Sequence, residues 1–182
     1  MRPLRSPVPL DRQRLDELAL AYVARFATSA AKLAQYLRRK LYERGWKGPG
    51  EPDLDALVAR LVAAGYVDDA GFARARASGL RRRGYGERRV QQALRGAGIA
   101  EAEREQARAS EAEARRAALV MVRKRGFGPF APERPDPARR EKQLAAMLRA
   151  GHSLDTARHL LDAANEAEAL DWVDEGAGDD RE

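Results

Sequence analysis

The sequence of 182 residues contains no cysteine, so it can form neither disulfide bonds nor thiolate metal sites. Aromatic residues make up only 6% of the chain. No stretch approaches the roughly 18 apolar residues that a membrane-spanning helix needs. The first residues, MRPLRSPVPL, also lack the continuous apolar segment of a signal peptide. We therefore expect a cytoplasmic protein with no membrane association.

Motifs of common catalytic and metal sites are missing as well, since the sequence has no HExxH, no phosphate-binding P-loop and no nucleophile elbow. His152 and His159 have no third ligand at a metal-like spacing, and we interpret them as ordinary surface or capping residues. Asp68 and Asp69 would point about 100° apart on a helix, which favours a helix start over a metal pair. The sequence predicts a protein that is not an enzyme and that has no metal or cofactor.

Charge is unevenly distributed along the chain. The last 17 residues, 166–182, carry eight acids and one base, whereas residues 1–165 carry 33 bases and 20 acids, a net charge of +13. A basic body of this kind indicates a polyanionic partner, nucleic acid first. The alternative is that long Arg-rich helices simply have solvated faces.

Helix is the expected secondary structure, because Ala and Arg dominate and β-branched residues are scarce. Apolar residues recur at helical spacing from Leu15 onward. The acidic tail should fray, although Leu170, Trp172 and Val173 would allow it to dock as a short amphipathic helix. The predicted helices cover about 15–26, 29–44, 53–64, 68–83, 87–97, 100–124 in one or two segments, 138–150 and 153–164.

Three of these helices end alike, at Gly45, Gly98 and Gly151, with intervals of 53 residues. An apolar residue stands four positions before each glycine. The pattern predicts an all-α fold of three tandem three-helix repeats forming an elongated, curved array, although Gly is a common helix terminator and chance is the alternative. The predicted parts are an irregular Pro-rich arm at 1–14, repeats at 15–66, 67–112 and 113–165, and the acidic tail at 166–182.

Arginine carries the strongest functional signal. Seven arginines fall between positions 74 and 89, opposed by Glu87 alone, and Tyr85 lies among them between two glycines. If the repeats stack regularly, such clusters would line an extended surface for a polyanion or an acidic filament. The alternative is a set of solvated faces whose Arg stems cover apolar surface. The main cluster is Arg74, Arg76, Arg81, Arg82, Arg83, Arg88 and Arg89, and smaller ones are Arg38, Arg39, Lys40 and Arg44, then Arg115, Arg116, Arg123, Lys124 and Arg125, then Arg139, Arg140 and Lys142.

The middle of the chain resembles the RecX family. Residues 65–73 (GYVDDAGFA) are similar to its motif, in which Gly-Tyr-hydrophobic-Asp-Asp leads into Phe-Ala, and a basic helix and Arg83-Gly84-Tyr85-Gly86 follow. The first and third repeats resemble the family through residues 37–46 and, more loosely, residues 126–130 and 147–151. The chain departs from the pattern at Arg76 and Gly79, which make the basic helix more polar, and at Ala93, where a Glu is frequent.

The resemblance implies a function. RecX proteins are all-helical modulators that bind within the groove of the RecA nucleoprotein filament and inhibit its ATPase, recombinase and coprotease activities. They thereby act in the regulation of DNA repair, recombination and the SOS response, and some bind DNA directly. We accordingly expect a monomer whose partners are the RecA filament and single-stranded or, as a second option, double-stranded DNA. The candidate contact residues are Arg81, Arg82, Arg83, Tyr85, Arg88 and Arg89, with Arg38, Arg39 and Lys40.

Two other functions remain open at this point. The first is a general nucleic-acid-binding helical repeat protein without filament specificity. The second is a helical scaffold for an acidic protein, without nucleic acid. Comparing affinity for bare single-stranded DNA with affinity for RecA-coated DNA at physiological salt separates the first from filament binding.

Overall fold

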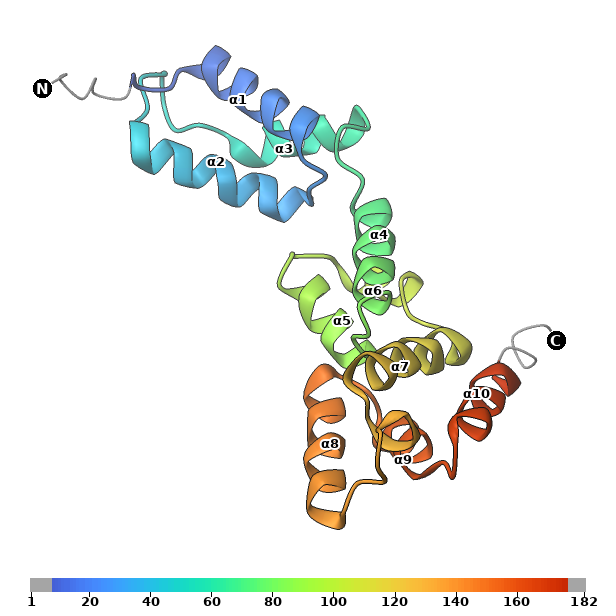
Figure 1. The fold of residues 1–182 in the computed structure, drawn as a ribbon. Helices are drawn as coiled ribbons and strands as arrows, with labels where there is room; N and C mark the ends of the chain where they lie inside the picture. The colour runs from blue at the N-terminus through green and yellow to red at the C-terminus, as the bar shows by residue number, and fades with distance from the viewer. Residues whose placement is uncertain (1–7, 177–182) are drawn as a thin grey trace, which may run out of the picture. The chain divides into compact units, whose positions relative to one another are not determined.

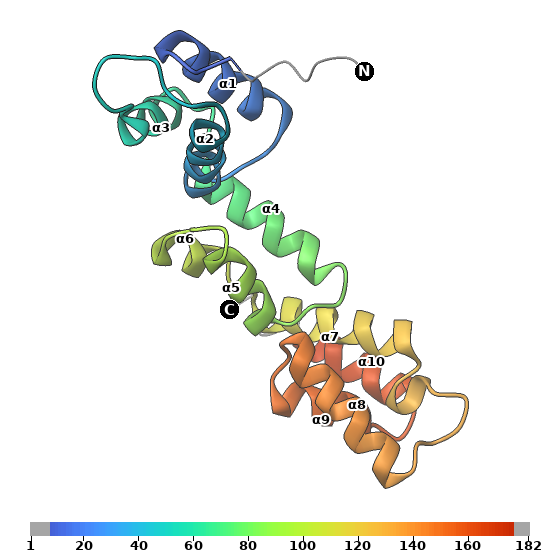
Figure 2. The same ribbon diagram turned by 90° about the vertical axis from the view of Figure 1, so that its left-hand side faces the viewer.

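The computed structural model describes residues 8–176, and within that range it contains helices and no β-strand, so the all-α prediction is confirmed. The chain divides into two compact units. Unit 1 consists of the residues up to 72 together with 97–100, and unit 2 consists of 73–96 together with the residues from 101 onward. Figures 1 and 2 show the helices of the chain in two views.

Unit 1 is built from three helices, α1 (Arg12–Arg25), α2 (Ala30–Arg44) and α3 (Leu54–Ala63) (Figure 1). Each begins where a side chain caps a free backbone amide at its start: Asp11 accepts from Arg14, Ser29 from Lys32 and Asp53 from Ala56. The buried apolar residues recur three or four positions apart, which turns one stripe of each helix inward. This core includes Leu15, Ala19, Leu33, Leu37, Leu57, Val58 and Leu61.

The end of the predicted arm is anchored to unit 1. Leu10 is fully buried, and its backbone bridges the turn after α2: its N–H donates to the Gly45 carbonyl at 2.9 Å and its carbonyl accepts from Lys47 at 2.8 Å. Helix α1 starts at Arg12, inside the segment predicted to be irregular. Residues 1–7, the first half of that arm, lie outside the described part of the chain.

Unit 2 takes up the rest of the described chain, beginning within α4 (Asp69–Arg81). Helix α7 packs against α9 and α10, and α8 packs against α9, around a core that includes Val122, Met147, Leu160 and Val173. Helix α5 contacts α6 and α8. The remaining elements are α5 (Glu87–Arg95), α6 (Glu101–Gln106), α7 (Glu111–Arg125), the 3-10 turn η1 (Gly128–Phe130), α8 (Pro137–Ala150), α9 (Leu154–Asp162) and α10 (Glu166–Glu175).

The first part of the acidic tail is a docked helix. The prediction that it frays is wrong for residues 166–175, and the alternative of a docked amphipathic helix is what the structure has. Ala169 and Val173 are buried, and Trp172 lies between the Arg115 guanidinium, 4.2 Å from its ring centroid, and the His159 imidazole at 4.8 Å. Residues 177–182 of the predicted tail lie outside the described range.

The three glycines that suggested a repeat all have a positive φ. The backbone φ angles are +79° at Gly45, +72° at Gly98 and +96° at Gly151. Residues other than glycine rarely adopt such angles. Gly45 and Gly151 follow α2 and α8 directly, whereas α5 ends at Arg95, before Gly98. The contact-based boundary between the two units falls within α4. The division into three repeats therefore stays a prediction.

Candidate functional site

The end of α8 and the start of α5 meet through backbone atoms alone. The Gly86 N–H donates to the Ala150 carbonyl at 3.0 Å, and the Arg88 N–H donates to the Gly151 carbonyl at 3.1 Å. The carbonyls at a helix C-terminus carry partial negative charge and the amides at an N-terminus carry partial positive charge, so this end-to-end arrangement is favourable. Arg88 and Arg89 are thereby placed beside the last turn of α8.

Two glycines make this close approach possible. A Cβ built on Gly86 would lie 2.3 Å from the backbone of Gly151 and His152, and one built on Gly151 would lie 2.4 Å from the Arg89 nitrogen. No side chain fits at either distance. We call this backbone contact, from Gly86–Arg88 to Ala150–His152, the α5–α8 joint.

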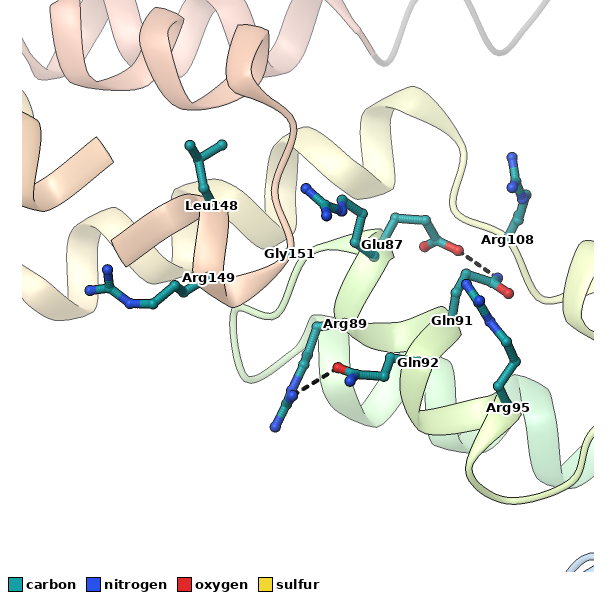
Figure 3. Close-up of a pocket in the computed structure, with 10 residues that line it drawn as sticks. Glu87, Arg89, Gln91, Gln92, Arg95, Arg108, Leu148, Arg149 and Gly151 are labelled. Atoms are coloured by element: carbon teal, nitrogen blue, oxygen red, sulfur yellow. Dashed lines mark hydrogen bonds between the residues drawn. The ribbon is translucent and has the colours of Figure 1, made fainter. Parts of the chain in front are cut away.

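A groove of about 880 Å³ opens beside the α5–α8 joint. Figure 3 shows Arg89, Gln91, Gln92 and Arg95 projecting from α5, Arg149 from the end of α8 and Arg108 from the loop before α7. A second groove of about 340 Å³ shares Arg89 and Gln92 with it and adds Arg76, Arg83 and Tyr85. The two grooves together form one surface, which we call the basic band, with seven arginines: Arg76, Arg83, Arg88, Arg89, Arg95, Arg108 and Arg149.

Most of this positive charge is available to a ligand. Within residues 8–176, the side chains of Arg76, Arg88, Arg95 and Arg149 make no hydrogen bond or ion pair. The carboxylate that lines the large groove, Glu87, is already committed to neighbours inside unit 2. The basic band therefore presents guanidinium groups suited to phosphate or carboxylate oxygens.

Arg81 neutralises Glu87 and is not part of the basic band. Its side chain is only 12% exposed, and its Nη2 donates to Glu87 Oε2 at 2.8 Å and to the Ala107 carbonyl at 2.6 Å. The other Glu87 oxygen accepts from Gln91 at 2.8 Å. Arg81 was predicted as a contact residue because it lies in the Arg-rich run, but its Nη2 donates to groups inside unit 2, so we propose a structural role for it.

The other predicted residues of this stretch are accessible. Arg83 lines the small groove, with its guanidinium carbon 5.9 Å from the centroid of the Tyr85 ring, and Tyr85 is 37% exposed. Arg88 and Arg89 line the large groove, and Arg89 also donates to Gln92 at 2.9 Å. Arg82 is exposed outside both grooves and donates to the Ser78 hydroxyl at 3.0 Å.

The predicted residues of the first repeat lie in unit 1 and are mostly paired. Arg38 is 4.0 Å from Asp55, and Arg39 and Lys40 lie 3.6 Å and 2.6 Å from Glu43. The hydrogen bond from Lys40 lowers the pKa of Glu43 below its ordinary value. Arg38 and Arg39 remain exposed, so their pairs are surface pairs of small energetic weight.

Four arginines of the basic band, Arg76, Arg95, Arg108 and Arg149, were not among the predicted contact residues, although Arg76 belongs to the main Arg cluster. Arg95 and Arg149 each stand at the end of a helix, at positions that look like ordinary favourable charges near a helix C-terminus. A signal for Arg149 was present, because it lies two residues before one of the repeated glycines. Only the α5–α8 joint brings it next to Arg88 and Arg89.

Between residues 8 and 176 there is no group of three or more His, Asp or Glu side chains that could hold a metal ion. In the same range, no helix is both long and apolar enough to cross a membrane. The basic band is the candidate site that we carry forward.

Comparison with known proteins identifies the family. A family model described as the second three-helix domain of RecX matches residues 68–107. The regulatory protein RecX of Myxococcus xanthus strain DK1622 is 33% identical over 161 residues, covering 82% of this chain and 84% of that protein. The chain belongs to the RecX family. The α5–α8 joint thus begins within the region that matches the RecX domain.

Solved structures of RecX share the fold. The crystal structure of RecX from Lactobacillus salivarius superimposes with a TM-score of 0.64 at 16% identity, covering 82% of this chain and 96% of that one. A second crystal structure of a regulatory protein RecX gives a TM-score of 0.61 at 16% identity, covering 82% of this chain and 70% of that one. The helical arrangement is therefore that of RecX proteins.

Proposed function

We propose that this RecX-family protein binds the RecA nucleoprotein filament and inhibits the ATPase, recombinase and coprotease activities of RecA. The protein would act as a monomer in the cytoplasm, through binding and not through catalysis. It would thereby regulate DNA repair and recombination. The observation that carries the proposal is the basic band, whose seven arginines face solvent beside a neutralised Glu87. A nucleoprotein filament offers both DNA phosphates and protein carboxylates, and a guanidinium recognises either.

The geometry of the basic band supports contact along a line and not at a point. Its arginines come from the α4–α5 segment, the loop before α7 and the end of α8, and the two grooves meet at Arg89. A ligand that fills both grooves must itself be extended. Both DNA and the groove of a filament meet that requirement.

The proposal is tested by the ATPase activity of RecA on single-stranded DNA while this protein is titrated in. The wild type should lower ATP hydrolysis in a dose-dependent way. A variant carrying Arg88→Gln, Arg95→Gln and Arg149→Gln should need a much higher concentration for the same inhibition. These three side chains have no partner within residues 8–176, so their replacement should leave the fold unchanged.

A matched control carries Arg12→Gln, Arg134→Gln and Arg139→Gln. It changes the net charge equally at exposed positions outside both grooves. Equal loss of inhibition in the two variants would show that overall charge, and not the basic band, is responsible. Full inhibition by the basic-band variant would refute the assignment of the site.

The second candidate is general nucleic-acid binding without filament specificity. The same basic band favours it, because free arginines in a groove neutralise phosphates of any strand. Equal affinity for bare and RecA-coated single-stranded DNA at physiological salt would favour this reading. Tighter binding to the coated strand would favour filament binding.

A further inference from the structure

Unit 1 contains a row of three aromatic rings that the basic band does not involve. Tyr22 of α1 and Tyr36 of α2 stack with centroids 4.1 Å apart and planes 17° from parallel. Phe26, which follows the last residue of α1, lies 5.3 Å from Tyr22 at 48°. The two tyrosines are half-buried against the core of unit 1, so they hold the row in a defined position.

Cations lie over both ends of this aromatic row. The Arg25 guanidinium is 5.3 Å from the centroid of Phe26. At the other end, Arg39 and Lys40 lie 5.7 Å and 5.9 Å from the centroid of Tyr36. Helix α2 as a whole carries five bases and one acid, Glu43. The row is therefore set in a positively charged surface.

Phe26 is the open end of the row, because its side chain is 48% exposed. Aromatic burial is a large source of stability in a small core, and unit 1 gains only part of it here. The Phe26 ring has a tyrosine near it on one side and a guanidinium above it. An exposed ring with an adjacent cation is an arrangement on which a neutral base stacks while the cation binds the neighbouring phosphate.

We propose that this aromatic row is a binding site for unpaired bases of a single-stranded nucleic acid. Every base has a π-face that stacks on Phe or Tyr, and the flanking cations would hold the phosphates on either side. Bases inside a duplex are already stacked on one another, so the site selects single strands. An apolar protein segment would gain contact with the rings but nothing from Arg25, Arg39 and Lys40.

The proposal is tested by fluorescence anisotropy with two labelled probes, an oligothymidylate and an abasic strand of equal length. The strands carry the same phosphates, so the ratio of their affinities reports base stacking. The wild-type protein should bind oligothymidylate more tightly. Phe26→Ala should weaken that binding about tenfold, as expected for loss of one base–aromatic stack, and leave abasic binding nearly unchanged.

Matched variants test whether the loss of affinity comes from the ring of Phe26. Tyr42→Ala removes a 93% exposed ring from α2, the helix that carries Tyr36, at a position outside the row. It should change neither the affinity for oligothymidylate nor that for the abasic strand. Phe26→Leu keeps an apolar side chain and should behave like Phe26→Ala, whereas Phe26→Trp should keep the preference. If Phe26→Ala lowers the helical circular dichroism, Phe26→Leu decides the result.

Two outcomes would overturn the site. One is a wild-type protein that binds both strands equally. The other is a preference for bases that survives Phe26→Leu and disappears in Tyr85→Ala, which would place stacking in unit 2. Because no RecA is present, failure here leaves the proposed inhibition of RecA untouched. Likewise, if the protein does not inhibit RecA, the proposal that the aromatic row binds unpaired bases is unaffected.

Discussion

The Nε2 atom of His152 lies 3.0 Å from the carbonyl oxygen of Gly84. The imidazole is buried, and with the two backbone hydrogen bonds of the α5–α8 joint it fixes the Gly84–Gly86 turn against the start of α9. His152 was predicted to be an ordinary surface or capping residue. The prediction of a surface position is wrong, because His152 is buried. It connects the residues that hold Arg83, Tyr85 and Arg88 in place.

The stability of unit 2 should depend on pH through His152. Burial lowers the pKa of the imidazole below its ordinary value of 6.5, against the opposing effect of the Gly84 carbonyl. Below that value the unfolded chain takes up a proton that the folded protein resists. The free energy of unfolding should therefore fall as pH decreases below 6.5 and level off once folded His152 is protonated. Urea unfolding at a series of pH values measures this change.

The variant His152→Gln separates this effect from general acid destabilisation. Gln can donate to the Gly84 carbonyl but does not titrate, so the fall in stability below pH 6.5 should become smaller. His159→Gln is the matched control, because His159 is exposed and lies away from the joint. An identical pH dependence in all three proteins would rule out His152 as the cause.

The α5–α8 joint should not tolerate a methyl group. Gly86→Ala would place a Cβ 2.3 Å from the Gly151 backbone, and forced overpacking of this kind costs about 1–3 kcal/mol. Gly96→Ala is the control, since Gly96 has a helical φ of −65° and its Cβ would be 3.4 Å from the nearest atom. Chemical denaturation should show a clear loss for the first variant and little change for the second. Equal stabilities would mean that the joint adjusts freely.

Arg81 and Arg82 are neighbours in sequence with different expected roles. Arg81→Met removes the ion pair with the partly buried Glu87 and the donor to the Ala107 carbonyl, at a cost of about 1–3 kcal/mol. Arg82→Met changes an exposed side chain and should stay within about 0.5 kcal/mol of the wild type. Denaturation midpoints compare the two directly. A larger loss for Arg82 would contradict the assignment of Arg81 as structural.

Binding of single-stranded DNA to the basic band should depend on salt in proportion to the phosphates it neutralises. For single strands each such contact adds about 0.7 to the slope of log affinity against log salt concentration. The variant Arg88→Gln, Arg95→Gln and Arg149→Gln should therefore reduce that slope by about 2. The Arg12, Arg134 and Arg139 control should keep the wild-type slope. A slope that the first variant leaves intact would place the phosphates elsewhere.

Helices were the predictable part of the fold. The helices predicted at 29–44, 53–64 and 153–164 begin at Ser29, Asp53 and Ser153, and each of these side chains accepts a backbone hydrogen bond at the start of its helix. These signals are local, because a capping side chain and the amide it binds lie three residues apart. Helix α10 was not among the predicted helices, since the acids of the tail favour fraying. Its docking depends on Trp172 meeting Arg115, 57 residues away in sequence, which no local pattern reveals.

The site was predictable only in outline. The Arg-rich run around Gly84–Gly86 predicted a stretch that lines part of the basic band, because charge density can be read from sequence. It did not separate Arg81 from Arg83, since both belong to the same run but only Arg81 turns toward Glu87. Arg108 and Arg149 come from other segments and join the basic band through tertiary contacts alone.

Because the α5–α8 joint consists of main-chain atoms and two glycines, it places few demands on the side chains around it. Arginines at the rim can be exchanged, added or lost without altering how the two helices meet. Substitutions at the rim should therefore change the affinity of the basic band without changing its geometry. Backbone and glycine set where the band lies, while its side chains set which ligand it binds.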